Sequence, residues 1–419
     1  MRASRVWRSS KAFLQAMQER NYRLGVVNGW FGAVGDTCLN AGIVLVPFAS
    51  QLGAPYVVVG LIPALMGFGY TLPQLFVAGK VRTRAYKLPI YTGSAWVRTT
   101  AYLLLIASSV LFADRPQLLL GALLVTLGLS AFANGVAGLP FLTVVAKVVP
   151  AERRPAFFGV RQLYGGLLAL LTGLFVRDML ASNVRFPYNY TIILSVGAVA
   201  FSVAYALFTR IHEPPDEETP EGPSGVRAEL RALPGTLRNP TMRRFLVPRA
   251  LLAFAGVADP FYAVYAIGVL GLPPSMLGVF LMVTTVVSPF SNLVWTRVAQ
   301  TYGSRRVIRL ATFIALLPPV LALSLPAGAG TWFALVFAAS ALAGPGINIG
   351  YTNYLLNFAP AHDRPRYIGV VNTTLGLLSF MPILGGGVAD QVGFPVVFSL
   401  ALTALGLSWF FVHKLSRTD

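Results

Sequence analysis

Long runs of apolar residues alternate with short polar segments along the whole chain. Twelve of these runs are about 20 residues or longer, which is enough to cross a hydrocarbon core of about 30 Å as a helix. Lipid offers the backbone no hydrogen-bond partners, and a barrel strand needs only about 9 to 11 residues, so the pattern predicts an all-α membrane protein with twelve transmembrane helices. The runs fall at 24–50, 55–79, 88–113, 117–148, 157–179, 188–211, 243–269, 273–299, 306–325, 330–358, 366–388 and 393–413.

A polar segment at 212–242 divides the runs into two sets of six. It is rich in proline and acidic residues between Glu213 and Pro223, a composition that resists a packed core and is typical of a linker. Within it, residues 226–237 are expected to form a short amphipathic surface helix. The predicted organisation is an N-terminal segment at 1–23, a six-helix bundle at 24–211, the linker, a second bundle at 243–413 and a tail at 414–419.

Two pairs of similar segments relate the two sets to each other. Pro150–Val160 and Pro360–Val370 share six of eleven residues, and each lies between two apolar runs. A second pair, Leu52–Gly60 and Leu270–Gly278, lies between the first two runs of each set. A repeat of this kind predicts two similar halves. Parallel six-helix repeats place a binding site at their interface near mid-membrane.

The composition agrees with a membrane protein, and the placement of charge predicts its orientation. The chain is 55% hydrophobic and 11% charged, with a mean hydropathy of +0.66, whereas soluble domains have about 25% charged residues. The net charge of +18 would indicate nucleic acid in a soluble chain. Here, 27 Lys and Arg residues lie in connections on one side of the predicted bundle and three on the other. We therefore predict a multi-pass protein of the cell (inner) membrane with both termini in the cytoplasm, whose basic residues meet anionic lipid rather than nucleic acid.

Over nearly its whole length, the sequence resembles the major facilitator superfamily of secondary transporters. Besides the two sets of six helices, residues 298–306 resemble the family's basic motif between helices 8 and 9, with Gln300 where the family often has Asp. Residues 79–84 keep the basic residues of the equivalent motif but lack its acid, and residues 385–394 resemble the family's turn between helices 11 and 12. In the fourth run, Asn134 stands where proton-coupled members often carry Arg. The resemblance implies the fold of that family and transport by rocking of two halves about a central site.

Ionisable residues within the apolar runs are few, and their cost in a membrane makes them candidates for function. Asp36 lies near the middle of the first run, Asp259 past the middle of the seventh, and Arg98 within the third. In one interpretation an acid binds a cation or proton and an Arg holds an anionic group of the substrate. In the other the acids form structural ion pairs between helices. The further predicted substrate- or ion-binding residues are polar: Asn28, Asn40, Tyr262, Asn348 and Asn353.

Two interpretations also remain for the arginines near the cytoplasmic ends of the runs. Arg154 and Arg364 occupy equivalent positions in the repeated turns, and Arg161 lies one or two turns inside the fifth run. They are predicted to close an inner gate by pairing with acids or with helix C-termini, where cations are favourable. Alternatively, they anchor the helices at the cytoplasmic interface. For the row Asn28, Gly32, Asp36 and Asn40 the alternatives are a cavity wall and close helix packing through small residues.

The sequence argues against several other classes of protein. One cysteine and three scattered histidines predict no disulfide and no metal site. No phosphate-binding loop or catalytic grouping is present, which argues against an ATP-driven pump or an enzyme, and no cofactor is expected. We predict a monomeric secondary active transporter of a small organic or drug-like solute, coupled to protons through Asp36 or Asp259. The alternatives are a lipid or lysolipid translocase of the same fold and a non-transporting receptor or scaffold.

Overall fold

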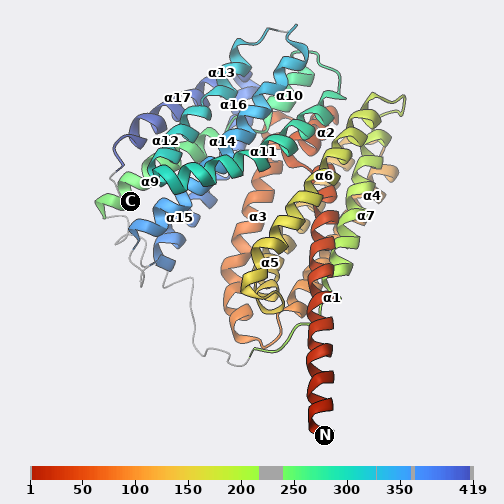
Figure 1. Ribbon diagram of the computed structural model, residues 1–419. Coiled ribbons are helices and arrows are strands. Elements are labelled where there is room, and N and C mark those ends of the chain that lie inside the picture. The colour runs from red at the N-terminus through yellow and green to blue at the C-terminus, as the bar shows by residue number, and fades with distance from the viewer. Residues whose placement is uncertain (1, 217–238, 327, 360–363, 416–419) are drawn as a thin grey trace.

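The computed structural model describes residues 2–216, 239–326, 328–359 and 364–415, and every regular element in these residues is a helix (Figure 1). The first half comprises α1 Arg2–Cys38, the π-helix η1 Ala41–Leu45, α2 Val46–Gln51, α3 Tyr56–Thr83, α4 Leu88–Leu111, α5 Pro116–Val148, the 3-10 helix η2 Ala151–Arg153, α6 Arg154–Ala181 and α7 Tyr188–Phe208. The second half comprises α9 Pro240–Ala255, α10 Phe261–Gly268, α11 Met276–Tyr302, α12 Ser304–Ile314, α13 Leu317–Ser324, the 3-10 helix η3 Gly330–Phe333, α14 Ala334–Phe358, α15 Arg364–Leu378, α16 Met381–Val392 and α17 Phe394–Val412.

Eleven helical stretches in the described residues are long and apolar enough to cross a membrane. The pair α9 and α10 supplies the twelfth crossing, so the six-plus-six arrangement is confirmed. The uninterrupted helix expected at 243–269 is nevertheless wrong, because α9 ends at Ala255 and α10 begins only at Phe261. Gly256 ends the first helix, and Pro260 precedes the second as its N-cap. Proline has no N–H to continue a helical hydrogen-bond ladder, and glycine favours a break.

The first helix of the first half is interrupted in a related place. It starts far before the expected residue 24, at Arg2, and ends at Cys38. Asn40 then caps the π-helix η1, its Oδ1 accepting a hydrogen bond of 2.9 Å from the N–H of Ile43. Both halves thus begin with a discontinuous crossing, a feature that frees backbone groups near the centre of a membrane protein.

Each half is a bundle with its own packing. In the first half α1 packs against α6 and α7, and α5 packs against α3 and α4. In the second half α14 packs against α11 and α12, and α9 packs against α17. A stack of aromatic rings fills the second half beside α10, where the rings of Tyr262 and Phe398 lie 5.1 Å apart.

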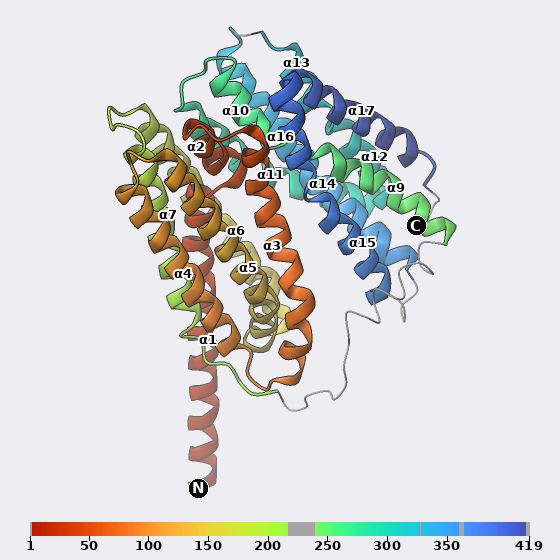
Figure 2. The ribbon, with the colours of Figure 1, turned by 180° about the vertical axis from the view of Figure 1, so that it is seen from behind.

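Contacts between the halves involve α3 with α16, α6 with α11, and α2 with α10. Figures 1 and 2 show that the halves meet where α2 and α10 lie and diverge toward the opposite end, at which α1 begins and α15 lies. Glycines allow the closest approach: a Cβ on Gly60 of α3 would overlap the carbonyl oxygen of Pro382, and one on Gly386 of α16 would overlap that of Tyr56. We call the diverging end, which carries Lys87, the basic end and the other the closed end.

The first residues of the expected linker are fixed on the first half. The buried carboxylate of Glu213 accepts hydrogen bonds from the backbone N–H groups of Lys87 and Leu88, at 2.8 and 2.7 Å, and from Lys147 Nζ at 2.8 Å. Asp216 forms ion pairs with both lysines, at 2.6 and 2.9 Å. Residues 213–216 therefore belong structurally to the first bundle, contrary to a free linker beginning at 212. The amphipathic helix expected at 226–237 lies outside the described residues.

Candidate functional site

A cavity of about 450 Å³ lies between α1 and α6 of the first half and α11 of the second. Asp36 is exposed to it, two residues before α1 ends, so this carboxylate lies at the interface of the two halves. Small residues on α1 and α6, among them Gly32 and Gly166, leave the space open. We call it the Asp36 cavity. Its other polar lining residues are Thr37, Arg161, Gln162, Thr284, Thr285 and Ser288.

Arg161 reaches this cavity from α6 and is fixed by the first half. Its Nη1 donates to the carbonyl oxygen of Gly25 and, at 2.9 Å, to Oδ1 of Asn28. The buried Asn28 in turn donates from Nδ2 to the carbonyl oxygen of Ala204 on α7 at 2.7 Å. A Cβ on Gly29 would overlap the Arg161 side chain, so glycine is needed for the arginine to pass. Arg161, expected at an inner gate, thus lies beside Asp36.

Arg98 lies inside the first half rather than in the cavity lining. Its side chain is buried, with Cζ 4.6 Å from the ring centre of Tyr205 and 5.3 Å from that of Phe201. Its Nε has no hydrogen-bond partner among the described residues, and the two aromatic faces stabilise its charge. Arg98 and Arg161 both act electrostatically on Asp36. The described part of the chain contains no ion pair of 4.0 Å or less that involves Asp36.

Asp259 lies in a second cavity, of about 250 Å³, beside the break between α9 and α10. The cavity is mostly apolar, with Tyr262 and Ser340 as the other polar lining residues, and Ile43 of the first half forms part of its wall. Asp259 is exposed to this space, whereas Tyr262 is buried against Phe398. The structure therefore does not bring Asp36 and Asp259 together in one cavity. Each acid lies within about one turn of a helix break.

The remaining predicted residues are spread over the molecule. Asn40 caps η1, and Asn348 is exposed on α14 outside the lining of both cavities. Asn353 lines a separate cavity at the basic end with Arg305. Arg154 donates to the carbonyl oxygens of Val149 and Ala146, at 3.0 and 2.6 Å, at the end of α5. The side chain of Arg364 lies outside the described part of the chain.

The sequence did not single out three hydroxyl-bearing residues that α11 contributes to the Asp36 cavity. Thr284, Thr285 and Ser288 line the α11 side and supply the only polar contacts that the second half makes to this cavity in the described residues. The spacing of four between Thr284 and Ser288 places them on one face of a helix. That spacing in an otherwise apolar run was the available signal. No group of three or more His, Cys, Asp or Glu side chains able to hold a metal occurs within the described ranges.

Comparison with known proteins gives the family and the fold. The family model described as the Major Facilitator Superfamily matches residues 26–377 and 250–418. None of the curated proteins compared with the chain matches its sequence significantly. Among solved structures, a variant of the nucleoside transporter NupG superposes with a TM-score of 0.70 at 13% identity, covering 96% of this chain and 100% of that one.

Two further structures superpose at similar coverage. A D-xylose–proton symporter gives a TM-score of 0.66 at 11% identity, with 95% of this chain and 98% of that chain covered. A bacterial homologue of the iron transporter ferroportin gives a TM-score of 0.68 at 15% identity in its inward-facing state and 0.56 at 14% in its outward-facing state. In both states 95% of this chain and 99% of that chain are covered. At these identities the likeness is one of fold.

Proposed function

This chain belongs to the Major Facilitator Superfamily, and we propose that it moves a small organic solute with an anionic group across the cell membrane, together with a proton carried by Asp36. The protein is a multi-pass membrane transporter, and we infer that it works as a monomer by alternating access. The observation that carries the proposal is the Asp36 carboxylate, which forms no ion pair with any residue that the structure describes and faces a cavity between the two halves beside a fixed arginine.

The chemistry of coupling follows from competition for Arg161. When Asp36 is ionised, its negative charge and the anionic group of the solute compete for the same guanidinium, because both act on it across one small cavity. When Asp36 is protonated, Arg161 is free to bind the anion, since a guanidinium pairs well with a carboxylate or phosphate. Binding of the proton therefore favours binding of the solute, and by linkage the reverse holds. The hydroxyls of Thr284 and Ser288 orient the solute from the second half.

We propose that the basic end faces the cytoplasm, as the distribution of Lys and Arg predicts, and that the structure is inward-facing. The contacts of α3 with α16 and α6 with α11 support this, because they join the halves toward the closed end. The TM-score against the ferroportin homologue is also higher for the inward-facing state, 0.68 against 0.56. The Asp36 cavity would then exchange solute and proton with the cytoplasm.

A thermal-shift experiment on the purified protein tests the substrate class. We expect a member of a panel of small organic monoanions to raise Tm, by several degrees at about 100 times its dissociation constant, and neutral sugars, nucleosides and lysolipids to leave it unchanged. The rise should grow as pH falls, because protonated Asp36 no longer competes with the anion for Arg161. Asp36→Asn should show the rise at every pH. A response confined to lysolipids would favour a lipid translocase instead.

Flux in proteoliposomes tests the coupling itself. Asp36→Asn should abolish uptake of the identified solute against its gradient when a pH gradient is imposed, while exchange of solute for solute persists, because only the proton carrier is lost. The matched control is Asp178→Asn, an exposed acid on α6 that pairs with Arg177 at 2.8 Å. Full pH-driven uptake by Asp36→Asn would refute proton coupling through this residue.

A further inference from the structure

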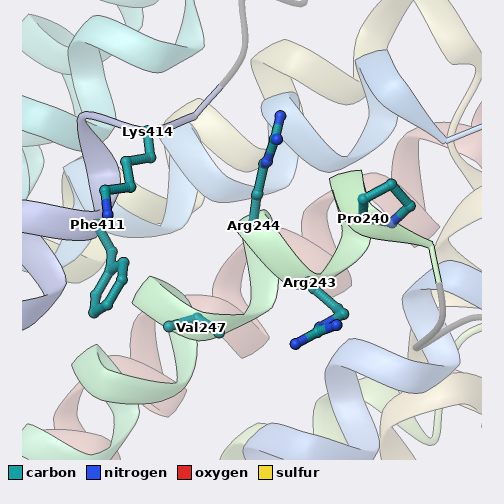
Figure 3. Close-up of a pocket in the computed structure, with 6 residues that line it drawn as sticks. All are labelled: Pro240, Arg243, Arg244, Val247, Phe411 and Lys414. Carbon is teal, nitrogen blue, oxygen red and sulfur yellow. The ribbon is translucent and has the colours of Figure 1, made fainter.

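A groove with three basic side chains lies on the surface of the second half, between the start of α9 and the end of α17. Its volume is about 320 Å³, and none of the described residues that line it is acidic. Figure 3 shows Lys414 and Phe411 on the α17 side and Arg244 and Val247 on the α9 side. The lining residues are Pro240, Arg243, Arg244, Val247, Phe411 and Lys414.

No acidic side chain in the described part of the chain neutralises the positive charge of this groove. Arg243, Arg244 and Lys414 are exposed, and none of the ion pairs in the described residues includes them. Lys414 Nζ lies 5.2 Å from the ring centre of Phe411, which leaves its charge in place. The first turn of α9 adds the positive end of a helix dipole next to Pro240, at the first helical position. An anion at this position would meet several favourable charges at once.

The groove is also bordered by apolar surface. Val247, one turn along α9 from Arg243, is 43% exposed, and Phe410, whose ring centre lies 4.7 Å from Lys414 Nζ, is 56% exposed. Trp409, in the same turn of α17, packs on Phe313 of α12 rather than on the groove. In a membrane protein such side chains face lipid, and a tryptophan near the end of a crossing is typical of the interfacial belt. The cations therefore lie at the level of lipid head groups, immediately beside surface that suits acyl chains.

We propose that this groove binds an anionic glycerophospholipid, whose phosphate contacts Arg243, Arg244 and Lys414 and whose chains lie on Val247 and Phe410. The charge selects an anionic head group, and basic grooves between crossings at this interface fit such lipids. The apolar border selects a lipid over a soluble phosphate, which would use only the cations. The bound lipid bridges the first and last crossings of the second half and stabilises their packing at the basic end.

Lipid binding is tested on the full chain purified in detergent, with dioleoylphosphatidylglycerol, dioleoylphosphatidylcholine and inorganic phosphate as separate probes and Tm as the readout. We expect phosphatidylglycerol to raise Tm and the other two to have little effect. Arg243→Gln/Arg244→Gln should weaken the phosphatidylglycerol response by roughly 30-fold in half-saturating concentration, because each basic residue at a membrane surface contributes roughly fivefold. Both side chains are exposed, so the variant should fold.

The matched control is Arg210→Gln/Arg297→Gln, which removes two exposed arginines that line none of the cavities described above. It should keep the wild-type response. An unchanged phosphatidylglycerol response in the groove variant would overturn the proposal, as would an equal loss in the control, which would indicate a general effect of surface charge. An equal response to inorganic phosphate would show a soluble-anion site instead. If the groove variant is itself unstable, native mass spectrometry of wild type and Lys414→Gln distinguishes the same outcomes by counting bound lipid.

Discussion

A single buried amide holds the proposed substrate arginine in place. Asn28 Oδ1 accepts from Arg161 at 2.9 Å and its Nδ2 donates to Ala204 at 2.7 Å. We predict that Asn28→Ala lowers the free energy of unfolding by about 1 to 3 kcal/mol, because buried polar partners lose their hydrogen bonds. It should also raise KM for the solute, since Arg161 is no longer positioned. Thermal unfolding and transport kinetics measure the two effects.

Asn353→Ala is the control for this prediction, because it removes the same kind of side chain from an exposed position at the basic end. It should change neither quantity appreciably. If Asn353→Ala raised KM as much as Asn28→Ala, the proposed role of the Asn28–Arg161 contact would be refuted.

At the level of residues, the sequence identified charges better than it identified their partners. Asp36 and Asp259 stood out because a carboxylate in an apolar run is costly, and the structure places each in a cavity. Arg161 was assigned to a gate from its depth in the sequence alone. Its contact with Asn28 joins residues 133 positions apart, and no local pattern encodes such a pair.

Glu213 and Asp216, at the start of the linker, bind it to the first half. The stability that this contact gives the folded protein should depend on pH. Partial burial acts to raise the pKa of Asp216, but hydrogen bonds and charge from Lys87 and Lys147 outweigh it and hold that pKa below its ordinary value. A lowered pKa in the folded state means that the carboxylate stabilises the fold above the ordinary carboxyl pKa of about 4, and that this contribution is lost as pH falls through the lowered value.

We therefore predict that Asp216→Asn lowers Tm by about 1 to 3 °C at pH 6 to 8, a small effect because the pairs are partly exposed. The difference from wild type should begin to shrink at about pH 4 and disappear once the pH falls below the lowered pKa of Asp216. Asp178→Asn, which removes an exposed carboxylate on α6, should show no comparable difference. If the Tm difference for Asp216→Asn persisted unchanged into acid, the ion pairs of Asp216 with Lys87 and Lys147 would not be its source.

At the level of elements, apolar runs predicted the crossings but not their interruptions. Gly256 and Pro260 were visible in the run 243–269, yet glycine and proline are common in transmembrane helices and do not by themselves mark a break. The fixed segment 213–216 was hidden for another reason. Its proline-rich, acidic composition is that of a linker. It is held on the first half by Lys87 and Lys147, which lie in connections far from it in the sequence.

For the whole molecule, the repeat predicted two similar halves but not which end is closed. Closure depends on surfaces that are far apart in the sequence. The carboxylate of Asp390 on α16 accepts hydrogen bonds from the backbone N–H groups of Tyr56 and Val57, at 3.0 and 3.1 Å, across 334 and 333 residues. It thereby caps the start of α3 from the other half, where a negative charge also interacts favourably with the helix dipole.

The contact of Asp390 with the start of α3 should consequently stabilise the closed state of that end. We predict that Asp390→Ala shifts the balance toward the state open at that end by roughly 5- to 30-fold, the equivalent of about 1 to 2 kcal/mol for the lost cap. Thr285→Cys in the Asp36 cavity reports the shift, in a background in which the buried Cys38 is replaced by Ala. An impermeant thiol reagent added to the closed end should label this cysteine faster in Asp390→Ala than in the parent.

Asp114→Ala is the control, because it removes an exposed acid between α4 and α5 that is not in this contact, and it should leave labelling unchanged. Equal labelling of the Asp390 variant and its parent would show that glycine-mediated packing of α3 on α16 suffices to keep the end closed.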